Sequence, residues 1–285
     1  MTTRVNAALA QSLAGLERDT PPRLANAIRH AVFPGGARIR PRLCIAVADA
    51  DRNDAPALVD ATACAVEMLH CASLVHDDLP CFDDADTRRG RPSVHQLFGE
   101  PVAVLCGDAL IVLAFETLAR AGASVPSRLA PLLTILTRAA GTPWGLIAGQ
   151  AWESEPSVPL ERYHRDKTGS LFVASAMAGA LAAGRDPAPW RTMGECLGLA
   201  YQVADDLLDA HARPDLAGKP TQRDRTLERP SAVAEHGTAG AIDKLRGLVA
   251  DAAASVPECN GAGSLRQLVV QMAERLVPPS LRQAA

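Results

Sequence analysis

Residues 61–91 read ATACAVEMLHCASLVHDDLPCFDDADTRRGR, and this stretch decides the first half of the fold. Its apolar first part predicts a buried helix, which ends at Asp77 and Asp78 because Pro80 prevents a regular continuation. The fifteen residues 77–91 then hold five carboxylates and three arginines. Carboxylates are unfavourable at a helix C-terminus, where the helix dipole is negative. A positive partner is therefore expected, either the arginines folded back or a divalent cation.

A second acidic stretch, residues 201–209, reads YQVADDLLD. Asp205 and Asp209 are four residues apart, so they share one helical face, and Gln202 lies on the same face. Two like charges at this spacing destabilise a helix unless a cation bridges them. Each stretch alone is also compatible with a solvated helix end that carries surface ion pairs.

The two acidic stretches together indicate a more specific chemistry. Hard oxygen ligands suit Mg²⁺, which proteins bind through carboxylates together with substrate phosphates. Guanidinium groups bind phosphate through paired hydrogen bonds. With apolar helices around them, these groups predict a site for a diphosphate on a hydrophobic tail.

The rest of the chain predicts an all-α protein in one domain, residues 1–285. Hydrophobic residues make up 48% of the sequence, but only ten of 285 residues are aromatic, which favours Ala- and Leu-rich helices over strands. Proline and glycine separate helical segments of ordinary length, and no alternating strand pattern is evident. The five clearest predicted helices span 57–78, 102–121, 170–183, 190–209 and 264–277. The polar stretch 213–230 is either a solvated loop or a flap over a site.

Charge and cysteine content limit the cellular setting. The net charge of −3 gives no reason to expect a nucleic-acid partner. The seven cysteines form no CxxC pair and lie mostly in apolar stretches, which favours buried thiols in a reducing compartment. Neither a secretory signal nor a charge-free span of transmembrane length is evident. We therefore expect a cytoplasmic protein without stable membrane insertion.

At these motifs the sequence resembles the trans-prenyltransferases, the polyprenyl diphosphate synthase family. DDLPCFD followed by RRG is similar to the first aspartate-rich motif of that family, and DDLLD is similar to the second. The segments PGGARIRP at 34–41, GLIAGQ at 145–150, HRDKTGSLF at 164–172 and LAGKP at 216–220 follow in the family order. Within the family, GGARIRP and HCASLVHDDLPCFDDA resemble the carotenoid-branch geranylgeranyl diphosphate synthases of phototrophic bacteria.

This resemblance implies the isoprenoid synthase fold, an antiparallel helical bundle around a deep central cavity, usually in a homodimer. It implies head-to-tail condensation of isopentenyl diphosphate with an allylic diphosphate, which could be dimethylallyl, geranyl or farnesyl diphosphate. The cofactor implied is Mg²⁺, as three ions. The departing pyrophosphate would accept the proton released, so no nucleophilic Ser, Cys or His is needed, and water must be excluded from the cation.

The resemblance also implies roles for individual residues. Asp77 and Asp83 would bind Mg²⁺ from one wall, and Asp205 would bind it from the facing wall with Asp209 behind it. The residues implied to hold the allylic diphosphate are Arg88, Lys167 and Lys219. The residues implied to hold isopentenyl diphosphate are Arg40, His70 and Arg89. Thr168 and Gln202 would face the developing allylic cation.

Small residues at two positions bear on product length. Ala72 and Ser73 precede the first motif where the family sets the floor of the tail pocket, and their size implies a C20 product. Ala37 departs from the family, which usually has Lys there, so the isopentenyl site loses a cation and Arg38 becomes a further candidate. The Trp152-Glu153 pair also departs from the common acidic pattern that follows GQ.

Three alternatives stay open on the sequence alone. A farnesyl diphosphate synthase would use the same chemistry with one addition fewer. A class I terpene cyclase would have a mixed second motif and no isopentenyl site, and DDLLD with Arg88-Arg89 disfavours it. A non-catalytic partner subunit would usually have lost one aspartate motif, and both are intact here.

Overall fold

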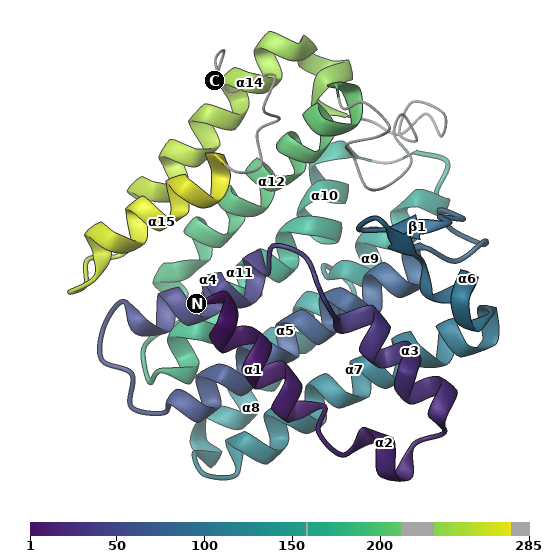
Figure 1. Ribbon diagram of the computed structural model, residues 1–285. Coiled ribbons are helices and arrows are strands. Elements are labelled where there is room, and N and C mark those ends of the chain that lie inside the picture. Colours follow the sequence, from purple (N-terminus) through teal and green to yellow (C-terminus); the bar gives the residue numbers. More distant parts are fainter. Residues whose placement is uncertain (158, 212–230, 275–285) are drawn as a thin grey trace.

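The structure, a computed structural model, describes residues 1–157, 159–211 and 231–274. These residues are predominantly helical, with one short hairpin (Figure 1). The elements are α1 Thr2–Ser12, α2 Leu16–Asp19, α3 Pro22–Val32, α4 Ile39–Asp49, α5 Pro56–Asp77, β1 Thr87–Arg88, β2 Arg91–Pro92, α6 Val94–Phe98, α7 Glu100–Gly122, α8 Pro126–Ala140, α9 Leu146–Ala151, η1 Trp152–Ser154, α10 Leu160–His164, η2 Arg165–Gly169, α11 Ser170–Ala182, η3 Ala188–Trp190, α12 Arg191–His211, α14 Ala232–Ala254 and α15 Ala262–Glu274. The predicted all-α class is confirmed.

The predicted helices correspond to α5, α7, α11, α12 and α15, with ends that differ by a few residues. Proline stands in the first turn of α5 and of α7, where the missing N–H has no intrahelical partner in any case. The expected end of α15 at residue 277 lies outside the described residues.

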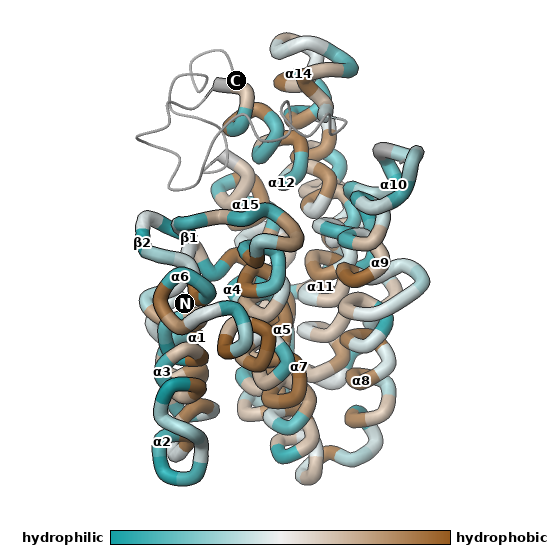
Figure 2. Tube along the Cα trace, turned by 90° about the vertical axis from the view of Figure 1, so that its right-hand side faces the viewer, coloured by the Kyte–Doolittle hydropathy of each residue, from teal (hydrophilic) through white to brown (hydrophobic). Residues whose placement is uncertain are grey.

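α5 is the central helix of the bundle. It packs against α7 along most of its length and also contacts α4 and α11. Hydrophobic residues run along α5 and α7, whereas α2 at the edge is hydrophilic (Figure 2). Side chains such as Met68 of α5, Leu110 of α7 and Leu132 of α8 are fully buried in this main core. The burial fixes the rotation of α5 and therefore the direction in which the carboxylates at its end point.

α12 forms the opposite side of the bundle and packs against α11, α14 and α15 (Figure 1). One core cluster joins it to α4 and α15 through Leu43, Leu197 and Leu265. Another joins it to α14 through Val203, Leu207 and Leu245. Since α12 is held on two sides, its acidic stretch has a fixed orientation.

The hairpin β1–β2 was not predicted. Thr87 pairs with Pro92 and Arg88 with Arg91, so the connecting loop is Arg89-Gly90. Both loop residues have positive φ, as tight two-residue hairpin turns require. Strands of two residues are too short to show an alternating pattern, which explains the miss. The hairpin turns Arg88 back toward the end of α5.

The thiols and the long apolar helices qualify two expectations. Cys44, Cys64, Cys71 and Cys106 are buried as expected, but Cys81 is exposed. Among the described residues, α5 and α7 are long and apolar enough to cross a membrane by length and composition. The apolar window of α5 is 78% buried inside the protein, whereas that of α7 is only 33% buried. Absence of membrane insertion therefore stays a prediction.

Candidate active site

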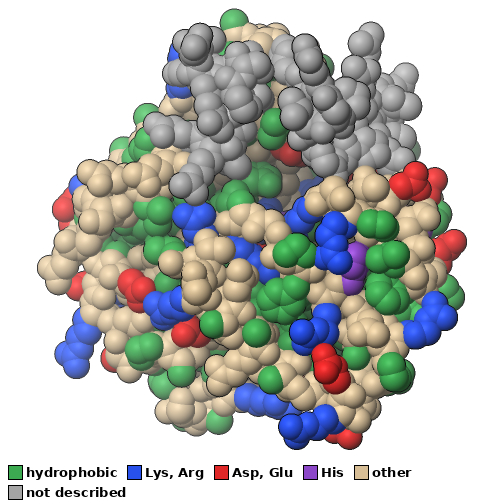
Figure 3. Space-filling view, viewed as in Figure 1, with side chains coloured by type: hydrophobic (Ala, Val, Ile, Leu, Met, Phe, Trp, Pro, Cys, Tyr) green, Lys and Arg blue, Asp and Glu red, His purple; other side chains and the backbone are tan. Residues whose placement is uncertain are grey.

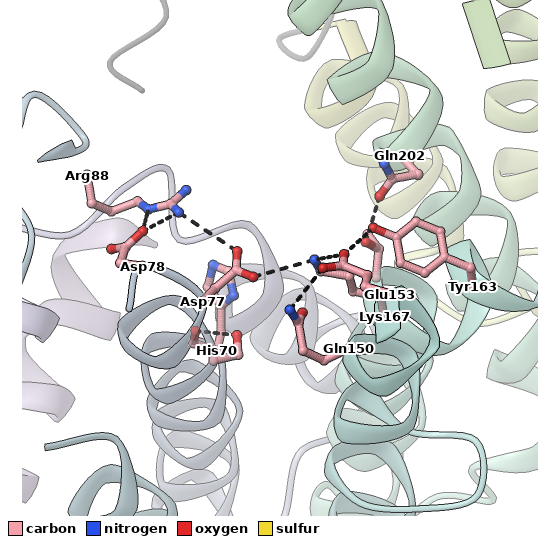
Figure 4. Close-up of polar contacts among 11 residues, drawn as sticks. His70, Asp77, Asp78, Arg88, Gln150, Glu153, Tyr163, Lys167 and Gln202 are labelled. Atoms are coloured by element: carbon pink, nitrogen blue, oxygen red, sulfur yellow. Dashed lines mark hydrogen bonds and ion pairs between the residues drawn. The ribbon is translucent and has the colours of Figure 1, made fainter. Parts of the chain in front are cut away.

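Asp77 lies at the C-terminal end of α5 between two side-chain cations (Figure 4). Its Oδ1 is 3.5 Å from Nζ of Lys167, and its Oδ2 is 3.8 Å from Nη2 of Arg88. Lys167 comes from the other side of the bundle, ninety residues later in the chain. The carboxylate therefore faces the space between the two sides.

Asp78 is turned into the protein and is 2% exposed. Nε of Arg88 donates a 2.9 Å hydrogen bond to Oδ1 of Asp78, and Nη2 of Arg88 donates to the same oxygen. Burial raises the pKa of Asp78, and the hydrogen bonds from Arg88 act against that rise. The positive partner expected at this helix end is thus an arginine folded back by the hairpin.

Lys167 and Thr168 lie in a π-helical turn, η2, which continues α10. Such wide turns project side chains differently from an α-helix and are frequent at functional sites. The turn packs directly against α9, because a Cβ at Gly149 would lie 2.2 Å from the backbone nitrogen of Lys167. Glycine at this position brings the end of α9 and the residues after it next to Lys167.

Glu153 is the main anion beside Lys167 (Figure 4). Nζ of Lys167 donates a 2.5 Å hydrogen bond to Oε1 of Glu153. The hydroxyl of Tyr163 donates to the same oxygen, also at 2.5 Å. Nε2 of Gln150 donates to Oε2 of Glu153 at 3.1 Å. Lys167 thus contacts two carboxylates, Glu153 more closely than Asp77.

Thr168 connects η2 to α12. Its hydroxyl donates a 2.7 Å hydrogen bond to Oε1 of Gln202. The close approach depends on Gly198, where a Cβ would lie 2.6 Å from Cα of Gly169. Because Lys167 contacts Asp77 and the next residue contacts Gln202, the two acidic stretches lie on opposite walls of one site. The resemblance to the prenyltransferases implies such an arrangement of the two stretches.

His70 and Arg40 form a second polar group on the same side as Asp77. His70 lies on α5, two helical turns before Asp77. Nη1 of Arg40 is 3.5 Å from Nε2 of His70. The guanidinium of Arg40 lies over the rings of Phe172 and Tyr201, at 4.6 and 5.3 Å from their centroids. This stacking holds a largely buried cation in place.

Burial, together with nearby positive charges, keeps His70 neutral. Burial lowers the pKa of His70 well below its ordinary value, and Arg40 and Arg89 lower it further. Arg89 is near enough to act on both residues and lies against Gly36, where a Cβ would be 2.8 Å from its Nε. The structure therefore places two charged arginines, Arg40 and Arg89, around a neutral His70.

Arg38 does not join this group, contrary to the expectation that it could replace the missing lysine. Its side chain is fully buried and pairs with Glu67, with Nη1 2.6 Å from Oε1. Its other nitrogens donate to the carbonyl of Val32 and to the side chain of Asn6. Arg38 has a left-handed backbone conformation that turns its side chain inward. Ala37 beside it is exposed.

Comparisons with known proteins identify the family of the chain. The sequence profile of the polyprenyl synthetase family matches residues 21–261. The chain belongs to the polyprenyl synthetase family. It is 50% identical to a geranylgeranyl diphosphate synthase of Cereibacter sphaeroides over 276 residues, covering 96% of each chain. It is 47% identical to a geranylgeranyl diphosphate synthase of Rhodobacter capsulatus, covering 96% of this chain and 95% of that one.

The fold of this polyprenyl synthetase also matches solved structures. A geranyltransferase from Helicobacter pylori, solved in complex with magnesium and isoprenyl diphosphate, superposes with a TM-score of 0.81 at 28% identity. The match covers 96% of this chain and 97% of that one. The predicted family and isoprenoid synthase fold are confirmed.

The carboxylates predicted to bind metal are spread over the two walls. Within the described residues, no three His, Cys, Asp or Glu side chains gather closely enough to hold a metal ion by themselves. Asp83 follows α5 and is tied to it by a 2.9 Å hydrogen bond from its N–H to the carbonyl of Asp77. Asp205 and Asp209 are half-buried on α12. Lys219 and the whole stretch 213–230 lie outside the described residues.

The two positions expected to set product length differ in their surroundings. Ala72 is 1% exposed and belongs to the main core. Ser73 is half-buried, and its hydroxyl donates to the carbonyl of His70 at 2.8 Å. A larger residue at 72 would meet packed core, whereas one at 73 meets a partly open space.

Sequence reasoning missed two carboxylates that touch the predicted site residues. Glu153 holds Lys167, and the departure of Trp152-Glu153 from the family pattern was the available signal. Asp206 accepts hydrogen bonds from Gln202 and from the start of α14. It stands between two predicted metal ligands, and nothing in the DDLLD pattern distinguishes it from them.

Proposed function

We propose that the protein is an Mg²⁺-dependent geranylgeranyl diphosphate synthase that condenses isopentenyl diphosphate with an allylic diphosphate. The observation that carries the proposal is the connection from Asp77 through Lys167 and Thr168 to Gln202, which brings both acidic stretches to one site. The relatives that the chain resembles over nearly its full length are geranylgeranyl diphosphate synthases.

The donor set suits Mg²⁺. Asp77 and Asp83 on one wall and Asp205 and Asp209 on the other supply hard carboxylate oxygens, and substrate diphosphate oxygens would complete the coordination of three ions. The contacts of Asp77 with Lys167 and Arg88 support this role, since they show that its position attracts positive charge. When bound, Mg²⁺ stabilises the departing diphosphate.

Cationic side chains divide into two groups that suit two diphosphates. Arg88 and Lys167, together with Lys219, would bind the allylic diphosphate beside Asp77. Arg40, His70 and Arg89 would bind isopentenyl diphosphate on the same wall. Figure 3 shows several Lys and Arg side chains near the centre of the face seen in Figure 1. His70, neutral before binding, can donate a hydrogen bond to a phosphate oxygen.

The oxygen of Thr168 and the amide of Gln202 would face the allylic carbons as positive charge develops there. Fixed dipoles aimed at the developing charge lower the barrier without reorganising. The alkene of isopentenyl diphosphate attacks the cation, and the released pyrophosphate takes the proton lost from the new product.

Small residues on α5 support a C20 product over the C15 product of a farnesyl diphosphate synthase. Ser73 is the better place to test this, because Ala72 is enclosed by core. We expect Ser73→Phe to shorten the main product toward C15.

We also propose a cytoplasmic homodimer that forms through α7. Val104, Leu105 and Val112 of α7 are 42%, 54% and 65% exposed, although this helix is among the most apolar. Exposed apolar side chains in such a group favour a covering partner. We expect a dimer in light scattering and a monomer for Leu105→Glu, with Ala14→Glu on another exposed site as the control. Binding of wild-type protein to lipid vesicles would instead favour a membrane surface.

The test of the main proposal is a product assay. Purified protein is incubated with Mg²⁺, isopentenyl diphosphate and farnesyl diphosphate, and the products are dephosphorylated and separated by length. We expect a C20 alcohol, loss of product in EDTA, and loss of product for Asp77→Asn but not for the exposed Asp19→Asn. Products from geranyl diphosphate that stop at C15 would identify a farnesyl diphosphate synthase. Absence of any product from the wild-type protein would favour a non-catalytic subunit of a prenyl synthase. We propose carotenoid synthesis as the pathway that the product serves.

A further inference from the structure

Asp206, the middle carboxylate of the second acidic stretch, is buried away from the other two. It is 3% exposed, whereas its neighbour Asp205 is half-buried. Oδ1 of Asp206 accepts a hydrogen bond from Nε2 of Gln202 at 2.9 Å. Oδ2 accepts from the backbone N–H of Ala232 at 2.7 Å, at the first residue of α14. The helix N-terminus and the N–H donor both stabilise negative charge at this carboxylate.

We propose that Asp206 is a positioning residue that sets the polarity of the Gln202 amide and, through it, of the Thr168 hydroxyl. The inference rests on the proposed function, in which the Thr168 oxygen faces the allylic cation. An ionised carboxylate can only accept hydrogen bonds, so it requires the NH₂ group of Gln202 to face it. The amide oxygen of Gln202 then faces Thr168, which must donate its proton, as the 2.7 Å contact shows.

The consequence lies at the oxygen of Thr168. With its proton committed to Gln202, the oxygen has its lone pairs left for other directions. The negative end of the Thr168 hydroxyl dipole can therefore point toward the developing positive charge. Its proton cannot point there, because it is donated to Gln202. Thr168 is 8% exposed, so little water competes for these lone pairs. Figure 4 shows Gln202 reaching from α12 toward the wall that carries Lys167.

Asp206→Asn tests the inference because it keeps the shape of the side chain, removes its negative charge and replaces one acceptor oxygen by an NH₂ donor. The N–H of Ala232 still needs an acceptor, so the oxygen of the new amide faces it and the NH₂ group faces Gln202. Gln202 then turns its own NH₂ group to the oxygen of Thr168. The hydroxyl of Thr168 no longer donates to Gln202, so its O–H bond can rotate toward the cavity. We expect kcat to fall about 100-fold, as for loss of one oriented dipole. The KM values of both substrates and the Mg²⁺ half-saturation concentration should change less than about twofold.

Thr168→Val gives the second arm, and it is informative even if Asp206→Asn fails to fold. Loss of the hydroxyl should lower kcat, and Thr168→Ser should retain it. In the double variant, Asp206→Asn should add little to Thr168→Val, because no hydroxyl remains to be misdirected. Wild-type kcat in Thr168→Val, or effects of the two changes that multiply, would overturn the inference.

Binding of two substrate analogues separates the polarity effect from a change in metal binding. The probes are geranyl S-thiolodiphosphate, which is neutral along its tail, and an aza analogue in which a protonated tertiary amine replaces carbon 3. In Asp206→Asn we expect about tenfold weaker binding of the aza analogue and unchanged binding of the thiolo analogue. Equal weakening of both would implicate Asp205 and Mg²⁺, and would overturn the inference.

Ser231→Ala is the matched control for α14. The Ser231 hydroxyl oxygen accepts the N–H of Ala234 at 3.2 Å, so the change weakens the same helix start without touching Gln202. It should lower Tm but leave kcat unchanged, and an equal loss of kcat would assign the effect to α14. A wild-type protein that makes no prenyl diphosphate would refute the proposed function. An active wild-type protein whose Asp206→Asn and Thr168→Val variants do not behave as expected would refute only this inference.

Discussion

Replacement of Glu153 by glutamine should weaken Mg²⁺ binding through Lys167. Nζ of Lys167 lies 2.5 Å from Glu153 and 3.5 Å from Asp77. At an effective dielectric of about 20, these distances correspond to attractions of about 7 and about 5 kcal/mol. The attraction of the ammonium to Glu153 thus exceeds its attraction to Asp77 by about 2 kcal/mol before screening, which holds the ammonium nearer to Glu153.

Without the charge of Glu153, the ammonium should pair with Asp77 and compete with a cation there. The side chains are 21%, 12% and 15% exposed for Lys167, Glu153 and Asp77, so screening is partial. If about 1.4 kcal/mol of this energy difference remains after screening, competition from the ammonium weakens Mg²⁺ binding about tenfold. We expect Glu153→Gln to raise the Mg²⁺ concentration at half-maximal rate by about that factor.

The assay is initial-rate product formation at saturating isopentenyl and farnesyl diphosphates over a range of Mg²⁺ concentrations. Glu153→Asp should recover part of the effect, because it restores the charge at a longer distance. Glu155→Gln removes an equal charge from an exposed position nearby and should leave the half-saturation value unchanged. An unchanged Mg²⁺ dependence in Glu153→Gln would refute the reasoning, and so would an equal change in the Glu155→Gln control.

Three further predictions concern the isopentenyl site and stability. Ala37→Lys should lower the KM for isopentenyl diphosphate in steady-state assays, and an unchanged or raised KM would show that the pocket is built around alanine. Glu67→Gln should destabilise the fold by about 3 kcal/mol in urea unfolding, because it leaves the Arg38 charge buried without its partner, whereas Asp49→Asn on the surface should cost under about 1 kcal/mol. Burial lowers the pKa of His164 from 6.5 to about 4, so its protonation opposes folding and its contribution to stability falls as pH drops from 6.5 to 4. His164→Gln should remove about 3 kcal/mol of that acid sensitivity, and a parallel pH profile in wild type and variant would contradict it.

The sequence by itself determined the helical class and where the two acidic stretches lie along the chain. Apolar runs, proline breaks and the absence of strand patterns are local signals, and α5 and α12 formed where those signals placed them. The position of Asp77 at the end of α5 and that of Asp205 in the last two turns of α12 follow from the same local patterns. The hairpin was missed because its strands have only two residues each.

The tertiary structure alone decided which way individual side chains face. Asp205 and Asp206 are neighbours in sequence, yet successive residues of a helix point about 100° apart, and packing on α14 buries only Asp206. Arg38 turns inward because Glu67, on another helix, can neutralise its charge there. Glu153 reaches Lys167 because Gly149 lets two segments touch. These contacts join residues distant in sequence, so no local pattern could predict them.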